Sequence, residues 1–298
     1  MPAVAPEFLI GTASWTDPTL IKSGAFYPPA ARSAAARLAF YASQFSTVEV
    51  DSTFYALPSE ENARLWAART PPDFVFNIKA FAWLTQHAAE SRRLPRIIRA
   101  ELPAAGCEAR MKAPSRELLA LAFEMFWSAL KPLREAGKLG LLLFQFPPYI
   151  TQKVSNFDFI ESLPARLPGA AIAIEFRHPS WFAGEAERRA TLKFLRDNRM
   201  TLVAVDAPPG VGLPLILDPT TNQVYVRFHG RNRENWYKHT SGAAERFKYL
   251  YAERELEEWA VRLQQLRGRV RRAFVIFNNC YSNFGVMNAT TMSQMLRR

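Results

Sequence analysis

The sequence predicts a single (β/α)8 barrel of the TIM type, as one domain over residues 1–298, with long loop excursions after the third and sixth strands. Three observations carry this prediction. Eight short β-rich runs recur along the chain, helical patterns lie between them, and the spacing from Ile10 to Ile276 averages 38 residues per unit. A lean barrel needs about 31 residues per unit, so the excess must lie in the loops. An open doubly wound sheet has the same alternation and is the structural alternative.

The strands are predicted from apolar runs of four to seven residues bounded by turn residues. Alternation of strands with helices is typical of parallel βα units. In chain order, the predicted strands are Phe8–Gly11, Thr47–Val50, Phe74–Lys79, Gly140–Gln145, Ala171–Phe176, Thr201–Asp206, Gln223–His229 and Ala273–Asn278.

The helices are predicted from apolar spacing and from capping residues. Ser59 can begin a helix that continues through Ala68, because its hydroxyl can accept from the first free backbone N–H groups. Further helices are predicted over Ser115–Glu135, Gly184–Asn198 and Ala244–Leu266. The connections 81–114 and 210–222 lack a clean period, and we expect them to be excursions on the barrel, the first one a mixture of loop and helix.

The composition is that of an ordinary globular protein, with 49% hydrophobic and 22% charged residues. Cys107 and Cys280 cannot make a disulfide framework, which favours a reducing compartment. The first residues lack the pattern of a signal peptide, and apolar runs stop short of the ~18 residues that a membrane span needs. We therefore expect a cytoplasmic protein without a membrane partner.

The net charge of +11 and the pI near 9.9 favour anionic partners, including phosphorylated metabolites, acidic proteins and nucleic acid. Basic residues concentrate in 92–112 and in the group Arg267, Arg269, Arg271 and Arg272. A solvated basic surface explains the same charge without any nucleic acid.

Side-chain alternation places polar groups inside the predicted barrel. Successive residues of a strand point to opposite faces, and the outward face must be apolar to pack on helices. On the sixth strand this rule assigns Val203 and Val205 to the outside and Asp206 to the inside. The residues predicted to face inward near the strand ends are Glu49, Asp51, Asn77, Lys79, Gln145, Glu175, Arg177, Asp206, Tyr225, Arg227, His229, Asn278 and Asn279, with Thr12 and Ser14 just past the first strand.

Polar strand ends of this kind predict a ligand site, because TIM-barrel enzymes carry their chemistry at the C-terminal mouth. The alternative is an ion-pair plug that only fills the barrel. Buried ion pairs contribute little net stability compared with apolar packing of similar volume, which favours the site. The predicted substrate-binding residues are Ser14, Trp15, Asp51, Gln145, Arg177, Arg227, Gly230, Arg231, Trp236, Asn278 and Asn279.

An anionic ligand is predicted after the seventh and eighth strands, the common phosphate seat of barrels. Gly230 would allow close backbone approach, and the fork of Arg231 matches phosphate or carboxylate oxygens. We therefore expect Arg231→Ala to weaken ligand binding without unfolding the protein. The alternative is that Arg231 and Arg233 are solvated loop charges.

Acid–base catalysis is predicted for Glu175, Glu49, Asp206 and His229, because clustered carboxylates push each other's pKa values apart. Glu175 is the first candidate for the general acid or base. Lys79 is either a counter-ion for Glu49 or a Schiff-base nucleophile. No HxH or HExxH spacing occurs, which argues against zinc. A single divalent metal on Glu49, Glu175, Asp206 and His229 is an alternative, and the sequence leaves any cofactor unknown.

Four tryptophans follow predicted strands or lie in their exit loops: Trp15, Trp83, Trp181 and Trp236. They would either stack on a base or sugar face or pack the loops. Cys280 has no histidine neighbour in the sequence and is predicted to be a small buried residue.

Six short motifs resemble the YecE-like proteins, a domain-of-unknown-function family (domain of unknown function 72). They are Gly11–Trp15, Val48–Tyr55, Phe144–Pro148, Ile174–Trp181, Arg227–Arg231 and Phe277–Asn279, in order from about Phe8 to the C-terminus. The resemblance implies a TIM-type barrel, related in shape to the sugar-isomerase and endonuclease IV group, and no assigned reaction. Asp51 stands where the family pattern leads us to expect Asn, and Cys280 follows the Asn pair in place of another polar residue. The histidine-rich trinuclear metal set is absent, so the endonuclease analogy is of the fold alone.

The leading functional hypothesis is an enzyme (a hydrolase, lyase or isomerase) that acts on a small phosphate- or carboxylate-bearing substrate by acid–base chemistry at the barrel mouth. The alternative is a nucleic-acid-binding or phosphodiesterase-like protein that uses the basic surface and exposed aromatics. A non-catalytic ligand sensor with the same pocket is a third hypothesis. The sequence leaves the oligomeric state open.

Overall fold

Eight parallel strands form one sheet that is nearly closed into a barrel, which confirms the predicted fold. The computed structural model describes residues 6–297 apart from 103–109, 114, 211 and 237–242. The barrel strands are β1 (Glu7–Thr12), β2 (Thr47–Val50), β3 (Val75–Lys79), β6 (Leu139–Gln145), β7 (Ala171–Glu175), β8 (Thr201–Asp206), β9 (Gln223–Phe228) and β10 (Arg272–Phe277). Their order is β1-β10-β9-β8-β7-β6-β3-β2, with every paired neighbour parallel. Each predicted strand lies within one residue of these bounds.

The first and second strands meet at the mouth and close the ring, which excludes the open-sheet alternative. Ala13 forms a parallel bridge to Glu49, and the backbone N–H of Ser14 donates to the Glu49 carbonyl at 2.8 Å. Gly11 permits this approach, since a Cβ at that position would stand 2.0 Å from the Thr47 carbonyl oxygen.

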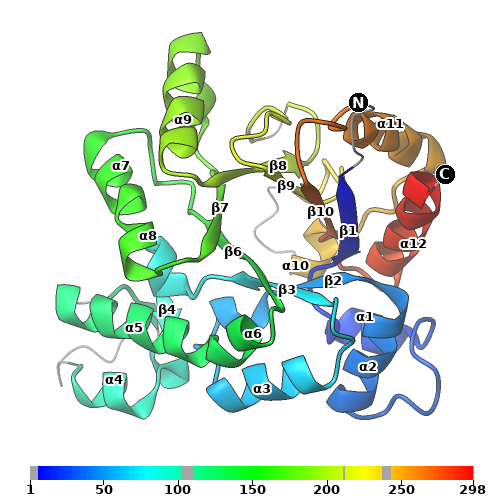
Figure 1. Cartoon of the computed structure of the whole chain (residues 1–298), viewed down its shortest axis with the longest axis horizontal. Coiled ribbons are helices and arrows are strands. Elements are labelled where there is room, and N and C mark those ends of the chain that lie inside the picture. Colours follow the sequence, from blue (N-terminus) through cyan, green and yellow to red (C-terminus); the bar gives the residue numbers. More distant parts are fainter. Residues whose placement is uncertain (1–5, 103–109, 114, 211, 237–242, 298) are drawn as a thin grey trace.

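Helices surround the strands on the outside of the barrel (Figure 1). Those at the first four strands are α1 (Pro18–Ser23), α2 (Ala34–Gln44), α3 (Glu60–Ala68), α5 (Arg116–Ala129), α6 (Lys131–Glu135), α7 (Val154–Glu161) and α8 (Leu163–Arg166). The remainder are α9 (Glu185–Asp197), α10 (Ala243–Arg246), α11 (Glu253–Gln264) and α12 (Phe284–Arg297). The predicted cap is confirmed, because Ser59 Oγ accepts from the backbone N–H of Asn62 at 3.1 Å.

Two of the predicted helices are each divided in two. The helix predicted over 115–135 ends at Leu130, and α6 begins with Pro132 in its first turn, because proline has no N–H to continue the preceding helix. The helix predicted over 244–266 is interrupted between α10 and α11. There, side-chain amides replace helical hydrogen bonds: Asn279 Nδ2 donates to the Tyr249 carbonyl, and Asn288 bonds both backbone groups of Tyr251.

Both predicted excursions are present on the barrel. The first contains the short antiparallel pair β4 (Ala89–Glu90) and β5 (Arg110–Met111), together with α4 (Arg96–Ala100). Cys107 lies outside the described residues. The second excursion contains no helix or strand in its described part, 207–210 and 212–222.

The core has an outer and an inner part. The outer part lies between strands and helices and contains most of the buried aromatic residues. The inner part fills the barrel with residues from seven strands: Leu9, Ala13, Val75, Leu141, Leu143, Ala173, Val203, Tyr225, Phe274 and Ile276. These apolar side chains form a floor, and the polar residues that follow them along the strands lie above it at the C-terminal end.

Strand β8 corrects the predicted facing of Asp206. Val203 and Val205 point into the barrel with the inner core, and Leu202 and Ala204 point outward. Asp206 therefore faces the helices. Every residue from Leu202 to Val205 is apolar, so the sequence pattern could not distinguish the two faces of this strand.

None of the described helices combines the length and the apolar character needed to cross a membrane.

Candidate active site

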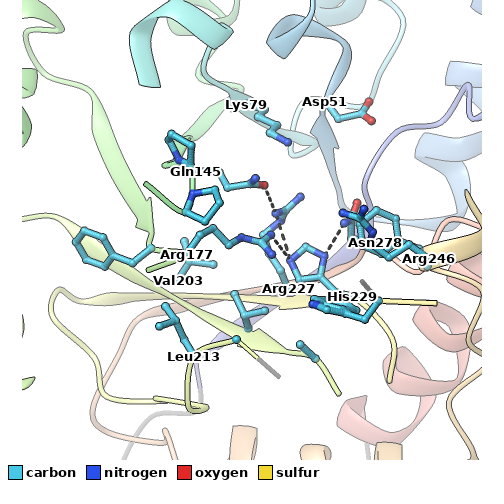
Figure 2. A pocket seen from close by; sticks show the side chains of 18 of the residues that line it. Asp51, Lys79, Gln145, Arg177, Val203, Leu213, Arg227, His229, Arg246 and Asn278 are labelled. Carbon is cyan, nitrogen blue, oxygen red and sulfur yellow. Dashed lines mark hydrogen bonds between the residues drawn. The ribbon is translucent and has the colours of Figure 1, made fainter. Parts of the chain in front are cut away.

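A cavity of about 1050 Å³ opens at the C-terminal end of the barrel. Its polar lining comprises Asp17, Asp51, Lys79, His87, Gln145, Arg177, Arg227, His229, Arg246 and Asn278. Its apolar walls include Phe54, Tyr55, Phe176, Phe182, Val203, Val205, Leu213, Ile216, Trp236 and Phe247. Figure 2 shows the central polar side chains converging from different strands.

Arg227 is the centre of a buried network beneath the cavity. Its Nη2 and Nε donate to the two carboxylate oxygens of Glu49 at 2.6 and 2.9 Å, and its Nη1 donates to Glu175 Oε2 at 2.6 Å. Gln145 Oε1 and the Tyr225 hydroxyl complete the arrangement, the latter donating to Glu49. An ion-pair plug does exist, therefore, but it forms the base of the cavity and does not fill it.

Glu175 is held as a carboxylate by two guanidinium groups. Its second oxygen pairs with Arg177 Nη2. Burial by itself would raise the pKa of Glu175, but the charges of Arg177 and Arg227 outweigh it and hold this pKa well below its usual range. A carboxylate so strongly stabilised is a weak base, which suits it to holding its neighbours in place.

His229 is neutral and its tautomer follows from its contacts. Arg177 Nη2 lies 3.0 Å from Nε2, and a guanidinium can only donate, so Nε2 accepts and Nδ1 carries the hydrogen. The Asn278 side-chain amide lies 2.7 Å from Nδ1 and must therefore present its oxygen. Burial, with the nearby charges of Arg177 and Arg227, lowers the pKa of His229 to about 3.

Lys79 stands apart from the Arg227 network. It is the last residue of β3, and its Nζ lies 4.6 Å from the centroid of the Phe54 ring. Within the part of the chain that the structure describes, this amine has no hydrogen bond and no carboxylate within 4.0 Å. Burial and the charge of Arg227 lower the pKa of Lys79 to about 8. The predicted ion pair with Glu49 is therefore absent, because Arg227 occupies both oxygens of Glu49.

Asp51 lines the cavity and has a pKa shifted toward neutrality. Burial, and then the charge of Glu49, raise this pKa above its usual value. Asp51 and Lys79 lie on the same side of the site in Figure 2, across from Arg177 and His229. Asp51 and Lys79 are thus a carboxyl group and an amine of the cavity whose pKa values both shift toward neutral pH.

Two arginines at the cavity retain unused donors. The Nε atoms of Arg177 and Arg246 are buried and have no hydrogen-bond partner among the described residues. Burial lowers the pKa of Arg177, and the neighbouring charges of Arg227 and Arg246 lower it further. Several positively charged side chains therefore lie close together at the cavity, and the Nε–H groups of Arg177 and Arg246 remain unpaired among the described residues.

Asp206 and Arg231, which are both predicted site residues, do not line the cavity. Arg231 forms two hydrogen bonds to Asp206, at 2.7 and 2.9 Å, and a third to Glu255 at 2.7 Å. Asp206 also accepts from Tyr251 and from Trp259 on α11. This cluster connects the mouth loops to the outer helices, and each nitrogen of the Arg231 guanidinium already donates to a carboxylate.

Four further residues of the predicted substrate-binding set, namely Ser14, Trp15, Gly230 and Asn279, do not line the cavity. Ser14 closes the barrel, and Trp15 packs against Trp66 and Phe76 in the outer core. Gly230 has φ +83° and approaches Tyr249, to which an added Cβ would come within 2.6 Å. Asn279 points outward to Asn288 of α12.

Of the four tryptophans singled out in the sequence, Trp236 lines the cavity and the other three do not. Trp83 and Trp181 are buried, and each donates its indole N–H to a backbone carbonyl. Trp236 does line the cavity, beside Phe247, which stacks on His229 with ring centroids 5.5 Å apart.

Sequence reasoning missed Arg246 and Phe247 because it assigned them to one long helix. The alternation of Tyr249 and Tyr251, followed by acidic residues at Glu253 and Glu255, was the available signal of an extended segment before a new helix start. His87, on the first excursion, was also missed. Burial and the charge of Lys79 lower its pKa to about 4.

The metal alternative is not supported by these positions. Asp206 faces away from Glu49, Glu175 and His229, and the two glutamates bind Arg227. Across the described residues, no group of three or more His, Cys, Asp and Glu side chains is arranged to hold a metal ion.

The basic residues near the start of β10 lie at the opposite end of the barrel from the cavity. Arg272 begins this strand and pairs with Glu7, and Arg269 approaches Asp218. The other basic segment lies on the first excursion, where Arg93 and Lys112 stand over the rings of Tyr55 and Tyr149.

Comparison with known proteins identifies one consistent group of relatives. The family model described as "Protein of unknown function DUF72" matches residues 9–298. The UPF0759 protein YunF of Bacillus subtilis is 32% identical over 293 residues, covering 96% of this chain and 94% of the relative. The UPF0759 protein YecE of Escherichia coli is 24% identical over 202 residues, or 67% of this chain and 59% of that protein.

Solved structures show the same fold. A DUF72 family protein from Thermotoga maritima superposes with a TM-score of 0.75 at 29% identity, covering 98% of this chain and all of that one. A DUF72 family protein from Enterococcus faecalis has a TM-score of 0.76 at 23% identity, covering 98% of this chain and 96% of that chain.

Proposed function

This chain belongs to the DUF72 family of proteins of unknown function, and from that premise we propose that it is an enzyme that acts by acid–base chemistry on a small anionic substrate at the barrel mouth. The observation that carries the proposal is the lining of the cavity. Lys79, Arg177 and Arg246 all reach it with donors that no described residue uses.

The anion follows from electrostatics. Three cations with open donors repel one another in a site that is partly removed from water, and a phosphate or carboxylate group would offset that repulsion. Guanidinium groups bind such oxygens in a forked geometry. Arg227 does not serve this purpose, because Glu49, Glu175 and Gln145 already occupy it.

The proton transfers fall to Lys79 and Asp51. A catalytic group works best when its pKa lies near the working pH, and these two residues are shifted in that direction. Glu175 and His229 are shifted away from it. We therefore assign Glu175 and Glu49 to positioning Arg227, and His229 to positioning Arg177.

The walls restrict the rest of the substrate. Phe54, Phe176, Trp236 and Phe247 present apolar faces on which a ring or a short carbon skeleton can pack. A volume of about 1050 Å³ accommodates a metabolite-sized molecule.

The nucleic-acid hypothesis keeps one supporting observation. Tyr55 and Tyr149 are about half exposed beside the mouth, and the cations of Arg93 and Lys112 lie over their rings. Such pairs of aromatic and basic residues suit a single strand. This alternative predicts binding that falls steeply with salt and that depends on the rim more than on Arg177.

A thermal-shift screen tests the proposal. Inorganic phosphate, small organic acids and a short single-stranded DNA are added to wild type, Arg177→Met, Arg246→Met and the exposed control Arg64→Met. A small anion at about 100 times its Kd should stabilise the fold by about 2.7 kcal/mol. The two cavity variants should lose this shift and the control should keep it.

Small acids that bind are then incubated with the protein in D2O, and NMR follows exchange of their carbon-bound hydrogens. We expect wild type to catalyse the exchange and Lys79→Met to fail. An anion response that survives both cavity variants, or a response to DNA alone, would contradict the proposal.

A further inference from the structure

We propose that Lys79 is a covalent nucleophile that forms an imine with the carbonyl carbon of an aldehyde or ketone bearing a phosphate or carboxylate group. This inference rests on the proposed function, because it places the substrate in the same cavity and names its chemical class.

The first support is the position of the amine. Lys79 ends β3 and lines the cavity, and its Nζ is free of any hydrogen bond or ion pair to the described residues. Figure 2 shows the side chain extending toward the centre of the site from one side. Glu49 and Glu175, whose charges favour the ammonium, present no free oxygen to this amine because they bind Arg227, and neither forms an ion pair with Lys79.

Lys138 provides an internal comparison. Among the lysines that the structure describes, it is the other one whose pKa is lowered by burial, and its residue is buried. Its Nζ donates to the carbonyls of Ala67 and Thr70, at 2.7 and 2.6 Å, and contacts Thr70 Oγ1 at 3.0 Å. That ammonium stabilises the end of α3. Lys79 has no such partners, and this contrast indicates a chemical role.

The second support is the state of the amine. Only the unprotonated form has a lone pair to attack a carbonyl. Burial and the charge of Arg227 disfavour the ammonium, and the pKa of about 8 leaves about a quarter of the amine unprotonated at pH 7.5. An ordinary lysine has about one part in a thousand.

The reaction balances without any further reagent. The Lys79 lone pair forms the C–N bond while the carbonyl π electrons move to oxygen, which takes a proton. The nitrogen then loses a proton, the hydroxyl group takes a second proton and leaves as water, and the C=N bond forms. Asp51, with its raised pKa, is the group in the cavity suited to deliver and recover these protons.

The product also explains the surrounding charges. A protonated imine withdraws electrons from the adjacent carbon, which eases the removal of a proton or the cleavage of a bond there. Arg177 and Arg246 would hold the substrate's anionic group and so direct its carbonyl carbon to Lys79. The proposed acid–base chemistry then takes place at the carbon atom next to this imine.

Reductive trapping tests the inference. Wild-type protein is incubated at pH 7.5 with glycolaldehyde phosphate, with its uncharged counterpart glycolaldehyde, or with pyruvate, and sodium cyanoborohydride reduces any imine to a stable amine. Peptide mass spectrometry then gives the labelling rate at each lysine. We expect glycolaldehyde phosphate or pyruvate to label Lys79 at least tenfold faster than Lys138 or the exposed Lys193.

Four controls make the result specific. The rate at Lys79 should rise with pH around a midpoint of about 8, free phosphate should suppress it, and Arg177→Met should slow it several-fold with the anionic probe and not with glycolaldehyde. Lys79→Arg should abolish the preferred adduct. Labelling that is uniform over the exposed lysines, or that spares Lys79 with all three probes, would overturn the inference.

The outcomes also separate the two proposals. If phosphate still stabilises the fold through Arg177 but no adduct forms at Lys79, the anion site stands and the imine fails. If no anion binds at all, both fail. The wild-type measurement decides the matter even where a variant does not fold.

Discussion

Arg227 and Glu49 form a two-point ion pair inside the barrel, with an Nη2–Oε1 distance of 2.6 Å and neither side chain more than 1% exposed. The same pair of residue types occurs on α3, where Arg64 and Glu61 also meet at 2.6 Å with about 60% of each side chain exposed. The distance is the same and the surroundings differ. A comparison of the two pairs therefore separates the effect of burial on stability from the effect of the contact distance.

Arg227→Met should destabilise the protein by about 3–5 kcal/mol, because Glu49 and Glu175 would keep their buried charges without a partner. Arg64→Met should leave the unfolding midpoint unchanged, since water solvates the remaining Glu61. Urea unfolding of both variants measures the difference. Equal midpoints would show that burial does not make the central pair essential.

Lys79→Met should stabilise the fold at neutral pH. The pKa of Lys79 is about 8 in the folded protein, below the usual 10.5, so folding disfavours its charge. Well below pH 8 the amine is charged in both states and the full cost, on the order of 3 kcal/mol, is present. The gain from Lys79→Met should shrink as pH rises from 8 toward 10.5. Urea unfolding at pH 7 and at pH 9.5 checks the sign; a loss of stability at pH 7 would refute it.

Acid should weaken the protein through two histidines that stay neutral when folded. The pKa values of His229 and His87 fall to about 3 and about 4, whereas an unfolded histidine takes up a proton near pH 6.5. Stability is therefore complete above pH 6.5 and is lost as pH falls toward these values, at up to about 1.4 kcal/mol per pH unit for each histidine. His229→Gln and His87→Gln should each reduce this slope between pH 6 and 5. Slopes identical to wild type would mean that the imidazoles are protonated in the fold.

Asp206→Asn tests the corrected position of this residue. Asp206 accepts from Arg231, Tyr251 and Trp259 on the outer side of the barrel, so the variant should lose about 2–4 kcal/mol of stability. Its response to phosphate in the thermal-shift assay should equal that of wild type. If the Asp206→Asn protein folds but no longer responds to phosphate, Asp206 does contribute to the anion site and the correction is wrong.

Much of the architecture was available from the sequence. The eight strands, their parallel arrangement and the inward facing of Glu49, Lys79, Glu175 and Arg227 follow from a period of two with apolar residues on one face. Where a strand is apolar on both faces, as in β8, the pattern does not show which residues face the inside of the barrel. For this reason the predicted facing of Asp206 is wrong. Loop residues carry no such period, and this is why Arg246 and His87 were missed.

The sequence by itself determined that charged strand ends would gather at one end of a barrel, because backbone alternation and the hydrophobic effect act along each strand locally. Only the tertiary structure decided which charges neutralise one another. Arg227 binds both central glutamates and Arg231 binds Asp206, while Lys79, Arg177 and Arg246 keep donors free. Pairing depends on distances of a few ångströms between strands far apart in the chain, and such distances are a property of the closed barrel.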